Sequence, residues 1–384
     1  METREKSSQQ QIVHAPSRGL AVRSAAIVAR GLRDLTRESN WLVQRVFAGH
    51  SPYLSISPAG HACAISSSVR QGAERVALYD IERSSSGVIL TVPGEASARL
   101  AEGRAMFAWS PTGRHLMAAW SAWPPELHAF DLQSKMSLGG FGGFSSFPSA
   151  LTWSDNGKYF AAAFSRSRDA ALRLWVSGPE SQNGMLCAGA PAQQCSLADL
   201  TSLIQRPVAA ESGAVPYDEA AAAGFGRLAF NPAGDILATA VETEGEWADD
   251  AIVLSQVPTL VARRAFLVSG HVTDMAWSFD GSRLLFCSAG QAYRLTAGSA
   301  EPVALPFGAE LCACHPYLPL CLCFSSWLKN SAKGRIFLAD LNKLTVLDEH
   351  AASGVAALRW SLDGSKAYAV TADGLAYIYE PPLL

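Results

Sequence analysis

The sequence lacks the features that mark nucleic-acid-binding, membrane-spanning and exported proteins. Its 384 residues carry 31 Lys and Arg against 34 Asp and Glu, a formal net charge of −3, so no basic excess predicts a nucleic-acid partner. No apolar run approaches the roughly 18 residues that a membrane-spanning helix needs. The first nine residues have no apolar core, so we expect neither a secretory signal nor export.

Disulfide and catalytic signatures are also missing. The eight cysteines show no spacing typical of a disulfide framework, which predicts reduced thiols and a cytoplasmic protein. There is no Gly-x-Ser-x-Gly elbow for a nucleophile. The glycine-rich stretch 139–144 follows no strand-to-helix pattern, so we interpret it as a flexible loop and not as a phosphate-binding turn. The sequence therefore predicts no catalytic residue and no cofactor.

What the sequence does contain is one motif in seven copies. Each copy has an apolar stretch that often ends in Trp-Ser, then a tight polar turn that most copies close with glycine, then a second apolar stretch. The copies lie at 57–60, 109–113, 153–157, 230–234, 277–281, 314–318 and 360–364, of which the sixth has lost its glycine. A repeat at this period predicts one small unit of structure that is stacked many times.

The stretches around each turn have the composition of β-strands, with β-branched and aromatic residues bounded by Gly, Ser and Asp. Most copies offer four strands, but the chain stops just after the third strand of the last copy. The missing strand is available at 41–47, and pairing it there would leave no open sheet edge. We therefore predict an all-β, seven-bladed β-propeller that is closed by an N-terminal strand completing the last blade.

Over residues 41–384 the chain resembles the WD-repeat propellers. The shared marks are Gly-His pairs at 49–50 and 270–271, before an inner strand, and Asp80, Asp131 and Asp340 at the ends of third strands. In that family such a His and Asp pair within a blade. Few blades of this chain carry these residues, so the resemblance implies a divergent member in which most of this network is missing. It also implies the role of a scaffold or accessory subunit.

Two segments lie outside the repeat. Residues 1–40 form an N-terminal extension, and the spacing of leucines and arginines in 20–38 predicts an amphipathic helix, packed on the propeller or docked on a partner. Residues 178–224 are rich in Ala, Gly and Ser and lie inside the propeller domain 41–384. We expect an irregular insertion there, with one short helix near 197–204.

One cluster of residues has the chemistry of a metal site. Cys312, Cys314 and His315 are followed closely by Cys321 and Cys323, and thiolates and imidazoles are the ligands that zinc prefers. However, a Cys-x-Cys spacing is shorter than in ordinary zinc sites, and it places each pair on one face of a strand. We therefore predict core thiols, with zinc as the alternative.

The connections between second and third strands differ from the uniformly tight turns. They are long at 66–75, 121–126, 165–170, 242–250 and 325–334, and alternating strand direction brings them all to one face of the disc. Trp and Arg are enriched at binding hot spots. The candidate partner-binding residues in these loops and at their edges are Trp123, Trp247, Trp327, Arg70, Arg75, Arg166, Arg168, Glu244, Glu246 and Lys329.

These patterns lead to a hypothesis of function. The chain is expected to be a non-enzymatic scaffold or complex subunit that binds another protein or a multi-subunit complex through the long-loop face. Any membrane contact would be indirect, through the N-terminal helix. The alternative is a propeller enzyme or small-ligand binder that uses the central channel.

Overall fold

The computed structural model describes most of the chain between Trp41 and Pro381. The gaps in this description are 49–50, 52, 69–73, 84, 92–104, 121–124, 143, 145, 165–170, 178–190, 197–198, 200–221, 244–248, 300 and 327–333. The expected N-terminal helix lies outside the described residues, as does all but Asp199 of the expected helix near 197–204. No helix among the described residues is long and apolar enough to cross a membrane.

The described strands form seven antiparallel sheets of four strands each. The first three blades are β2 (Leu54–Ile56), β3 (Ala62–Ser68), β4 (Glu74–Asp80), β5 (Ser85–Thr91); β6 (Ala105–Trp109), β7 (His115–Trp120), β8 (Glu126–Asp131), β9 (Met136–Phe141); and β10 (Pro148–Trp153), β11 (Tyr159–Phe164), β12 (Ala171–Val176), β13 (Gln193–Ser196). The fourth and fifth are β14 (Ala222–Phe230), β15 (Ile236–Thr243), β16 (Asp250–Gln256), β17 (Val261–Val268); and β18 (Val272–Trp277), β19 (Arg283–Ser288), β20 (Gln291–Thr296), β21 (Val303–Ala304). The sixth is β22 (Leu311–Cys314), β23 (Leu320–Ser325), β24 (Arg335–Asp340), β25 (Thr345–Ala351), and the seventh is β26 (Val355–Trp360), β27 (Ala367–Thr371), β28 (Leu375–Tyr379), β1 (Trp41–Arg45).

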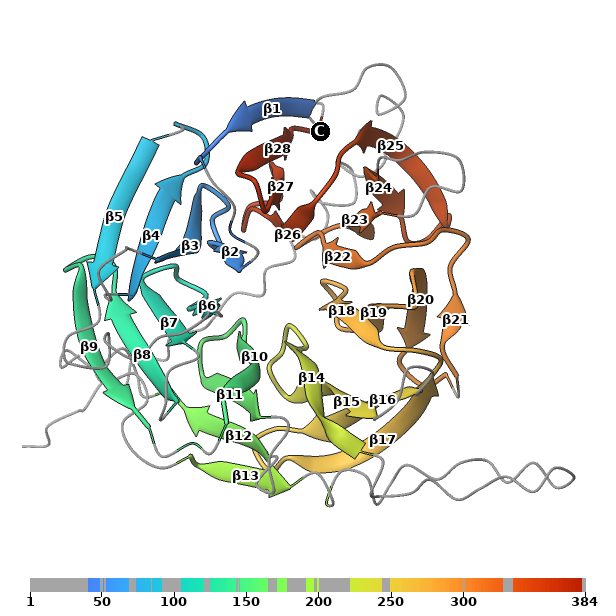
Figure 1. Cartoon of the computed structure of the whole chain (residues 1–384). Coiled ribbons are helices and arrows are strands. Elements are labelled where there is room, and N and C mark those ends of the chain that lie inside the picture. The colour runs from blue at the N-terminus through green and yellow to red at the C-terminus, as the bar shows by residue number, and fades with distance from the viewer. Residues whose placement is uncertain are drawn as a thin grey trace, which may run out of the picture.

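The blades stand around a central axis, with the first strand of each blade innermost and the fourth outermost (Figure 1). Side chains alternate along each strand, so every blade presents one apolar set to each of its two neighbours. Each of the seven gaps between blades holds one cluster of buried apolar side chains. This is the seven-bladed propeller that the repeated motif predicts.

The ring closes as predicted. β1 pairs with β28 in antiparallel register from Trp41↔Tyr379 to Arg45↔Leu375. The Val46 amide then donates to the Gly374 carbonyl at 2.8 Å, and the Trp41 and Tyr379 rings lie 4.9 Å apart. The N-terminal strand therefore completes the last blade and covers its edge.

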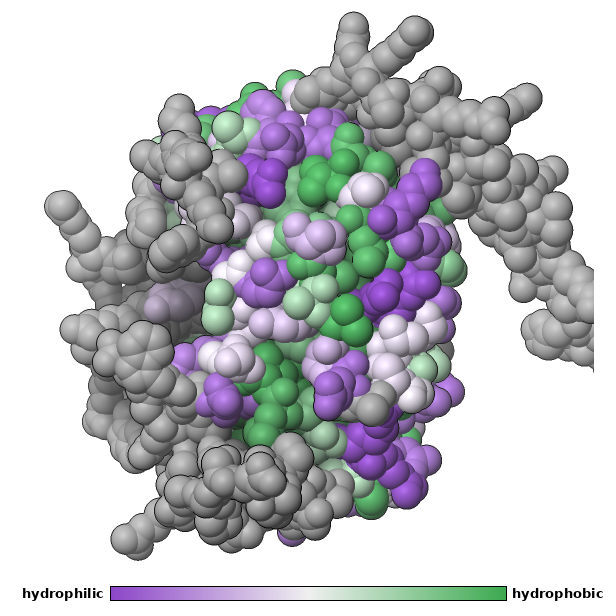
Figure 2. Space-filling view, turned by 90° about the vertical axis from the view of Figure 1, so that its right-hand side faces the viewer, coloured by the Kyte–Doolittle hydropathy of each residue, from purple (hydrophilic) through white to green (hydrophobic). Residues whose placement is uncertain are grey.

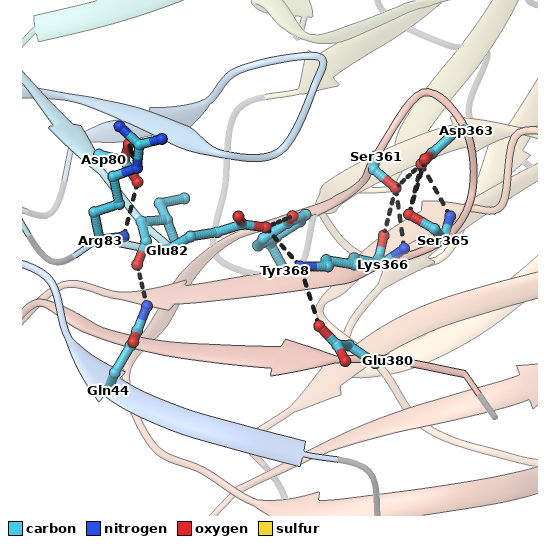
Figure 3. A network of polar contacts seen from close by, with 11 residues as sticks. Gln44, Asp80, Glu82, Arg83, Ser361, Asp363, Ser365, Lys366, Tyr368 and Glu380 are labelled. Carbon is cyan, nitrogen blue, oxygen red and sulfur yellow. Dashed lines mark hydrogen bonds and ion pairs between the residues drawn. The ribbon is translucent and has the colours of Figure 1, made fainter. Parts of the chain in front are cut away.

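A polar network ties this last blade to the first (Figure 3). Lys366 reaches Glu82 at 2.8 Å and Glu380 at 3.0 Å, and the Tyr368 hydroxyl donates to Glu82 at 2.9 Å. The hydrogen bonds from Lys366 and Tyr368 lower the pKa of Glu82. Gln44 of β1 donates to the Ile81 carbonyl in the same region. The seam between the two ends of the ring is thus held by hydrogen bonds as well as by packing.

The chemistry of the repeated turn explains its sequence. In the fifth blade the Ser278 hydroxyl donates to Asp280 at 2.6 Å and accepts the amide of Arg283 at 3.0 Å. The amide of Gly281 donates back to the Ser278 carbonyl at 2.9 Å, and its φ of 67° lies in the left-handed region that favours glycine. The serine and the glycine therefore fix a tight reversal between the first two strands.

The tryptophan of the motif joins neighbouring blades. The indole N–H of Trp277 donates to the Ala229 carbonyl at 3.1 Å, and that of Trp360 donates to the Ala313 carbonyl at 3.0 Å. Trp109 makes the same contact with Ser55 at 3.3 Å. In each case the acceptor lies on the innermost strand of the preceding blade. These three contacts satisfy carbonyls on the exposed edges of β2, β14 and β22, whereas the indole N–H of Trp153 has no partner among the described residues.

The degenerate sixth copy replaces the serine by His315. Its Nδ1 accepts the amides of Tyr317 and Leu318, both at 3.0 Å, and its Nε2 donates to the Gly364 carbonyl at 3.1 Å. Burial lowers the pKa of His315 to about 4, so the ring stays neutral and can both donate and accept. One imidazole thereby fixes a turn that has no glycine.

Most of the expected, largely irregular insertion 178–224 lies outside the described residues, but its described part contains β13, the fourth strand of the third blade, and the start of β14 at Ala222. One other expectation is wrong. The stretch 139–144 is not simply a loop, because Gly139 and Gly140 lie in β9. A side chain at Gly140 would meet the His128 ring at 2.8 Å, so a glycine there reflects close packing in a strand.

Candidate functional site

The predicted partner-binding residues lie almost entirely outside the described part of the chain. This holds for Trp123, Trp247, Trp327, Arg70, Arg166, Arg168, Glu244, Glu246 and Lys329. Arg75 lies in β4, next to the connection after β3. The structure therefore does not test whether these side chains come together.

The two faces of the ring can be defined by the strand ends. On the long-loop face, longer connections follow β3, β7, β11, β15 and β23, whereas β19 and β27 are followed by short ones. The turn face is the opposite one and carries the seven tight turns between first and second strands. The connections lie where the sequence indicates, but those after β3 and β7 have five residues and are no longer than the tight turns.

One His–Asp pair on the long-loop face joins the start of β16 to the segment that leads into β18. His271 Nδ1 lies 3.0 Å from Asp250 Oδ1, and Asp250 Oδ2 accepts the amide of Val272 at 2.8 Å. The resemblance to WD repeats pointed to aspartates at the ends of third strands, but Asp250 begins such a strand. Asp131 and Asp340 instead accept amides of the turns that follow them.

The outer rim of the ring is formed by the fourth strands of the blades. In Figure 2, which shows the side of β20 and β21, apolar and hydrophilic side chains are interspersed. The apolar residues exposed on the outermost strands include Val261 and Val303. Single exposed aliphatic side chains are ordinary on protein surfaces, so these two residues do not by themselves indicate a site.

The cysteines that resembled a metal site lie between the fifth and sixth blades. Cys312 and Cys314 face Cys323 and Cys321 across the strand pair, and Cys312, Cys321 and Cys323 are buried. Hydrogen bonds with neighbouring thiols, together with burial, raise the pKa of Cys312, Cys314 and Cys323. Among the described residues no group of three or more Cys, His, Asp or Glu is arranged to hold a metal, and both nitrogens of His315 are already engaged.

We predict that protein purified without chelator contains well below one zinc ion per chain. Hydrogen bonds from Cys314 and Cys323 lower the pKa of Cys321 to about 5, so the cluster offers one thiolate beside three protonated thiols. Metals bind the thiolate, and a single one is too few for a zinc site. Elemental analysis measures this directly, and Cys314→Ser should lower the melting temperature because it introduces a more polar hydroxyl into an apolar gap. Stoichiometric zinc that disappears in Cys312→Ser or Cys321→Ser would contradict this interpretation.

The central channel contains a cavity of about 540 Å³. Its shape follows from the residue that precedes the last position of each innermost strand. In six blades this residue is small and lines the cavity: Ser55, Ala108, Thr152, Ala229, Ala276 and Ala313. In the seventh blade it is Arg359 of β26, which lines the same cavity. We call these seven positions the channel layer.

Charged groups in and beside the cavity are few. Arg359 makes no hydrogen bond or ion pair with the other described residues, and its electrostatic partner is Asp155, in the turn after β10. Burial lowers the pKa of Arg359 and raises that of Asp155. Asp274 also lines the cavity, but its two oxygens accept the amides of Met275 at 3.0 Å and Cys312 at 2.9 Å. Burial raises the pKa of Asp274 to about 6.

The mouth of the cavity opens on the turn face and is largely apolar. Phe279, Tyr317 and Leu362 line it from three successive blades, with 41%, 51% and 50% of their surface exposed. Pro111 and Pro232 line it on other blades, and Asp155 is the charged residue of this rim. Apolar side chains that surround a hollow differ from singly exposed ones, because they can bury surface against something that enters.

Sequence reasoning missed this site, although a signal was present. Aligning the seven copies on their turns places Arg359 at a position that is otherwise Ser, Ala or Thr. The same alignment places Asp155 where Pro or an apolar residue stands in the other copies. The two departures from the repeat pattern are the two charges that act on one another in the channel.

Fold and site together define a seven-bladed β-propeller with a hollow, sparsely charged channel. The family model for the WD domain, G-beta repeat, matches residues 136–176 and 263–293. These segments run from β9 to β12 and from β17 into β20, so the similarity to WD repeats in sequence covers these two parts of the propeller. No curated protein matches the chain in sequence.

Solved propellers are similar to this chain in shape. The β-propeller domain of Cps50 (Swd1) from Myceliophteria thermophila has 14% identity and a TM-score of 0.59, covering 88% of this chain and 99% of that one. Hydrazine synthase from Kuenenia stuttgartiensis has 12% identity and a TM-score of 0.61, covering 89% and 98%. A chain of a mitotic checkpoint complex has 13% identity and a TM-score of 0.57, covering 90% and 96%. Similarity at this level extends to the fold alone.

Proposed function

We propose that this protein is a non-enzymatic interaction scaffold, an accessory subunit that binds a protein partner through its long-loop face. The observation that carries the proposal is the contrast between the two faces. Turns of one design, with five or six residues between the strands, repeat on the turn face, whereas the connections on the long-loop face vary from two residues after β19 to nine after β23. Long loops on a rigid scaffold are where proteins usually place recognition.

The rigidity of the ring supports this role. All seven gaps between blades are packed with buried apolar side chains, and β1 covers the edge of β28 in the last blade. A mitotic checkpoint complex contains a propeller of similar shape, which is compatible with a role as a complex subunit. This analogy concerns the architecture, and a shared fold does not by itself imply a shared function.

The alternative role, in an enzyme or a small-ligand binder, has an observation of its own. Hydrazine synthase contains the same fold, so the fold does not exclude catalysis. The cavity in the channel would be the place for such chemistry. The cytoplasm is the proposed compartment, supported by seven unpaired cysteines among the described residues.

The test is to isolate the partner with the tagged full-length protein and to measure its affinity for variants. Replacing Trp123, Trp247 or Trp327 by alanine should weaken binding by about 2 kcal/mol, roughly thirty-fold in Kd, where the residue is an anchor. The melting temperature should barely change, because loop side chains contribute little to blade packing. Calorimetric titration measures the first effect and a thermal melt the second.

The control variant lies on the turn face. Thr112→Ser keeps the hydroxyl that meets Ser110 at 3.2 Å and should leave partner binding unchanged. Asn156 is less suitable, because its side chain donates to the Ala233 carbonyl of the next blade at 2.8 Å. If the partner tolerates all three tryptophan variants but loses affinity when the turn face is altered, the long-loop face is the wrong surface.

A further inference from the structure

We propose that the central cavity binds a small zwitterionic ligand of the α-amino-acid type, with its carboxylate at Arg359 and its ammonium at Asp155. This site lies inside the ring and does not rest on the proposed scaffold role. It takes its ligand through the mouth on the turn face.

The cavity is large enough for a small ligand. Six small residues in the channel layer leave the cavity open where longer side chains would fill it. Its volume of about 540 Å³ falls within the range of roughly 300–1,000 Å³ that small-ligand sites occupy. Arg359 is the one long side chain of this layer, so any ligand that enters meets its guanidinium.

Two opposite charges, on Arg359 and Asp155, face the cavity without meeting. Arg359 belongs to β26 and Asp155 follows β10, and these strands stand on opposite sides of the channel (Figure 1). The two groups act on one another electrostatically but form no ion pair within 4 Å. Arg359 is half-buried, whereas Asp155 is exposed at the mouth of the cavity. Because the guanidinium and the carboxylate do not meet, each is stabilised by an opposite charge placed between them.

The two charges lie at different depths of the channel. Arg359 precedes the end of an innermost strand, whereas Asp155 lies in a turn at the mouth, so the positive charge is the deeper one. Around Asp155 the rim is apolar, with Phe279, Tyr317 and Leu362 exposed. Asp274 does not compete for the ammonium, because both of its oxygens are occupied by backbone amides. A ligand therefore enters with its carboxylate first and leaves its ammonium and an apolar side chain near the rim.

The experiment uses the purified full-length chain and two probe series. Phenylalanine is compared by titration calorimetry with N-acetylphenylalanine, phenylalaninamide and N-acetylphenylalaninamide, and leucine with its three matching derivatives. Removing either charge should weaken binding about ten-fold, since hydrogen bonds to charged groups are the strong ones. Arg359→Gln should abolish the preference for a free carboxylate, and Asp155→Asn should abolish the preference for a free ammonium.

Two further variants keep the test interpretable. Arg359→Lys retains the charge and should retain the carboxylate preference, which provides a result even if Arg359→Gln folds poorly. Arg263→Gln removes an arginine of the outermost strand β17 that donates to the Gln256 side chain at 3.0 Å, and it should bind all probes like the unaltered protein.

Three outcomes would overturn the proposal. One is the absence of binding by both series at millimolar concentration. Another is equal binding of the acetylated acids and the free amino acids, which would indicate a plain carboxylate site. The third is binding that Arg359→Gln and Asp155→Asn leave unchanged. None of these measurements involves the protein partner, so failure here and failure of the scaffold proposal are distinguishable.

Discussion

Deleting residues 1–47 is expected to abolish the cooperative unfolding transition of the protein, whereas deleting residues 1–38 leaves it intact. The longer deletion removes β1, which pairs with β28 over its whole length. It also removes Val46 and Phe47, which are 4% exposed and pack in the gap between the last and first blades with Tyr368 and Ile378. Without them the ring loses both a strand and the packing of one gap.

The physical reason for so large an effect is the edge that remains. β28 would present unpaired amides and carbonyls along an apolar sheet, which favours association with other chains. Thermal and urea unfolding monitored by circular dichroism would show the loss of the transition, and light scattering would show the association. The 39–384 fragment is the matched control, because it keeps β1. A 48–384 fragment that unfolds with the same midpoint as the full chain would show that closure contributes nothing.

The blade count and the closure could be predicted from the sequence because both depend on local chemistry. The polar groups that fix a turn interact within five residues of one another, as Ser278 does with Asp280 and with the amide of Arg283. Such patterns are visible in a linear sequence. The closing strand followed from counting strands, since a propeller with an incomplete last blade would leave an edge open.

The fourth strand of the third blade could not be predicted in the same way. β13 has the sequence Gln-Gln-Cys-Ser, in which only Cys195 is buried, so it carries no alternation of apolar residues. Its pairing with β12 is imposed by the blade. Gly139 and Gly140 likewise indicated a loop, because glycine usually weakens a strand, but close packing against His128 requires glycine at position 140.

The channel site shows a different limit. Arg359 and Asp155 are more than two hundred residues apart in sequence, and only closure of the ring brings their blades to face each other. Each residue alone is an ordinary surface-type side chain in a strand or a turn. The repeat nevertheless indicates the site, because these two residues differ in type from their counterparts in the other blades. In a symmetric scaffold, residues that depart from the repeat pattern are candidates for a specific function.

The second large effect is expected at one glycine of the repeated turn. Gly60→Ala should destabilise the protein by about 2–5 kcal/mol, whereas Gly157→Ala should cost only about 1–2 kcal/mol. Both glycines close the same kind of turn, with φ values of 82° and 68°, so both alanines carry the cost of a left-handed backbone. Gly157 has nothing within 4 Å of an added Cβ, but a Cβ on Gly60 would lie 2.1 Å from Cε2 of Tyr368.

The Tyr368 ring cannot move aside easily. It is fully buried between the last and first blades, and its hydroxyl is bound to Glu82 at 2.9 Å. The extra cost of Gly60→Ala is therefore an overpacking term located at the seam that closes the ring. Urea unfolding of both single variants measures the difference, and a double-mutant cycle with Tyr368→Leu isolates the contact. In the Tyr368→Leu variant, Gly60→Ala should lower the free energy of unfolding by less than it does in the unaltered protein, because removing the ring relieves the clash. Equal destabilisation by the two alanines, with no coupling to Tyr368, would mean that the turn backbone alone accounts for the glycine at position 60.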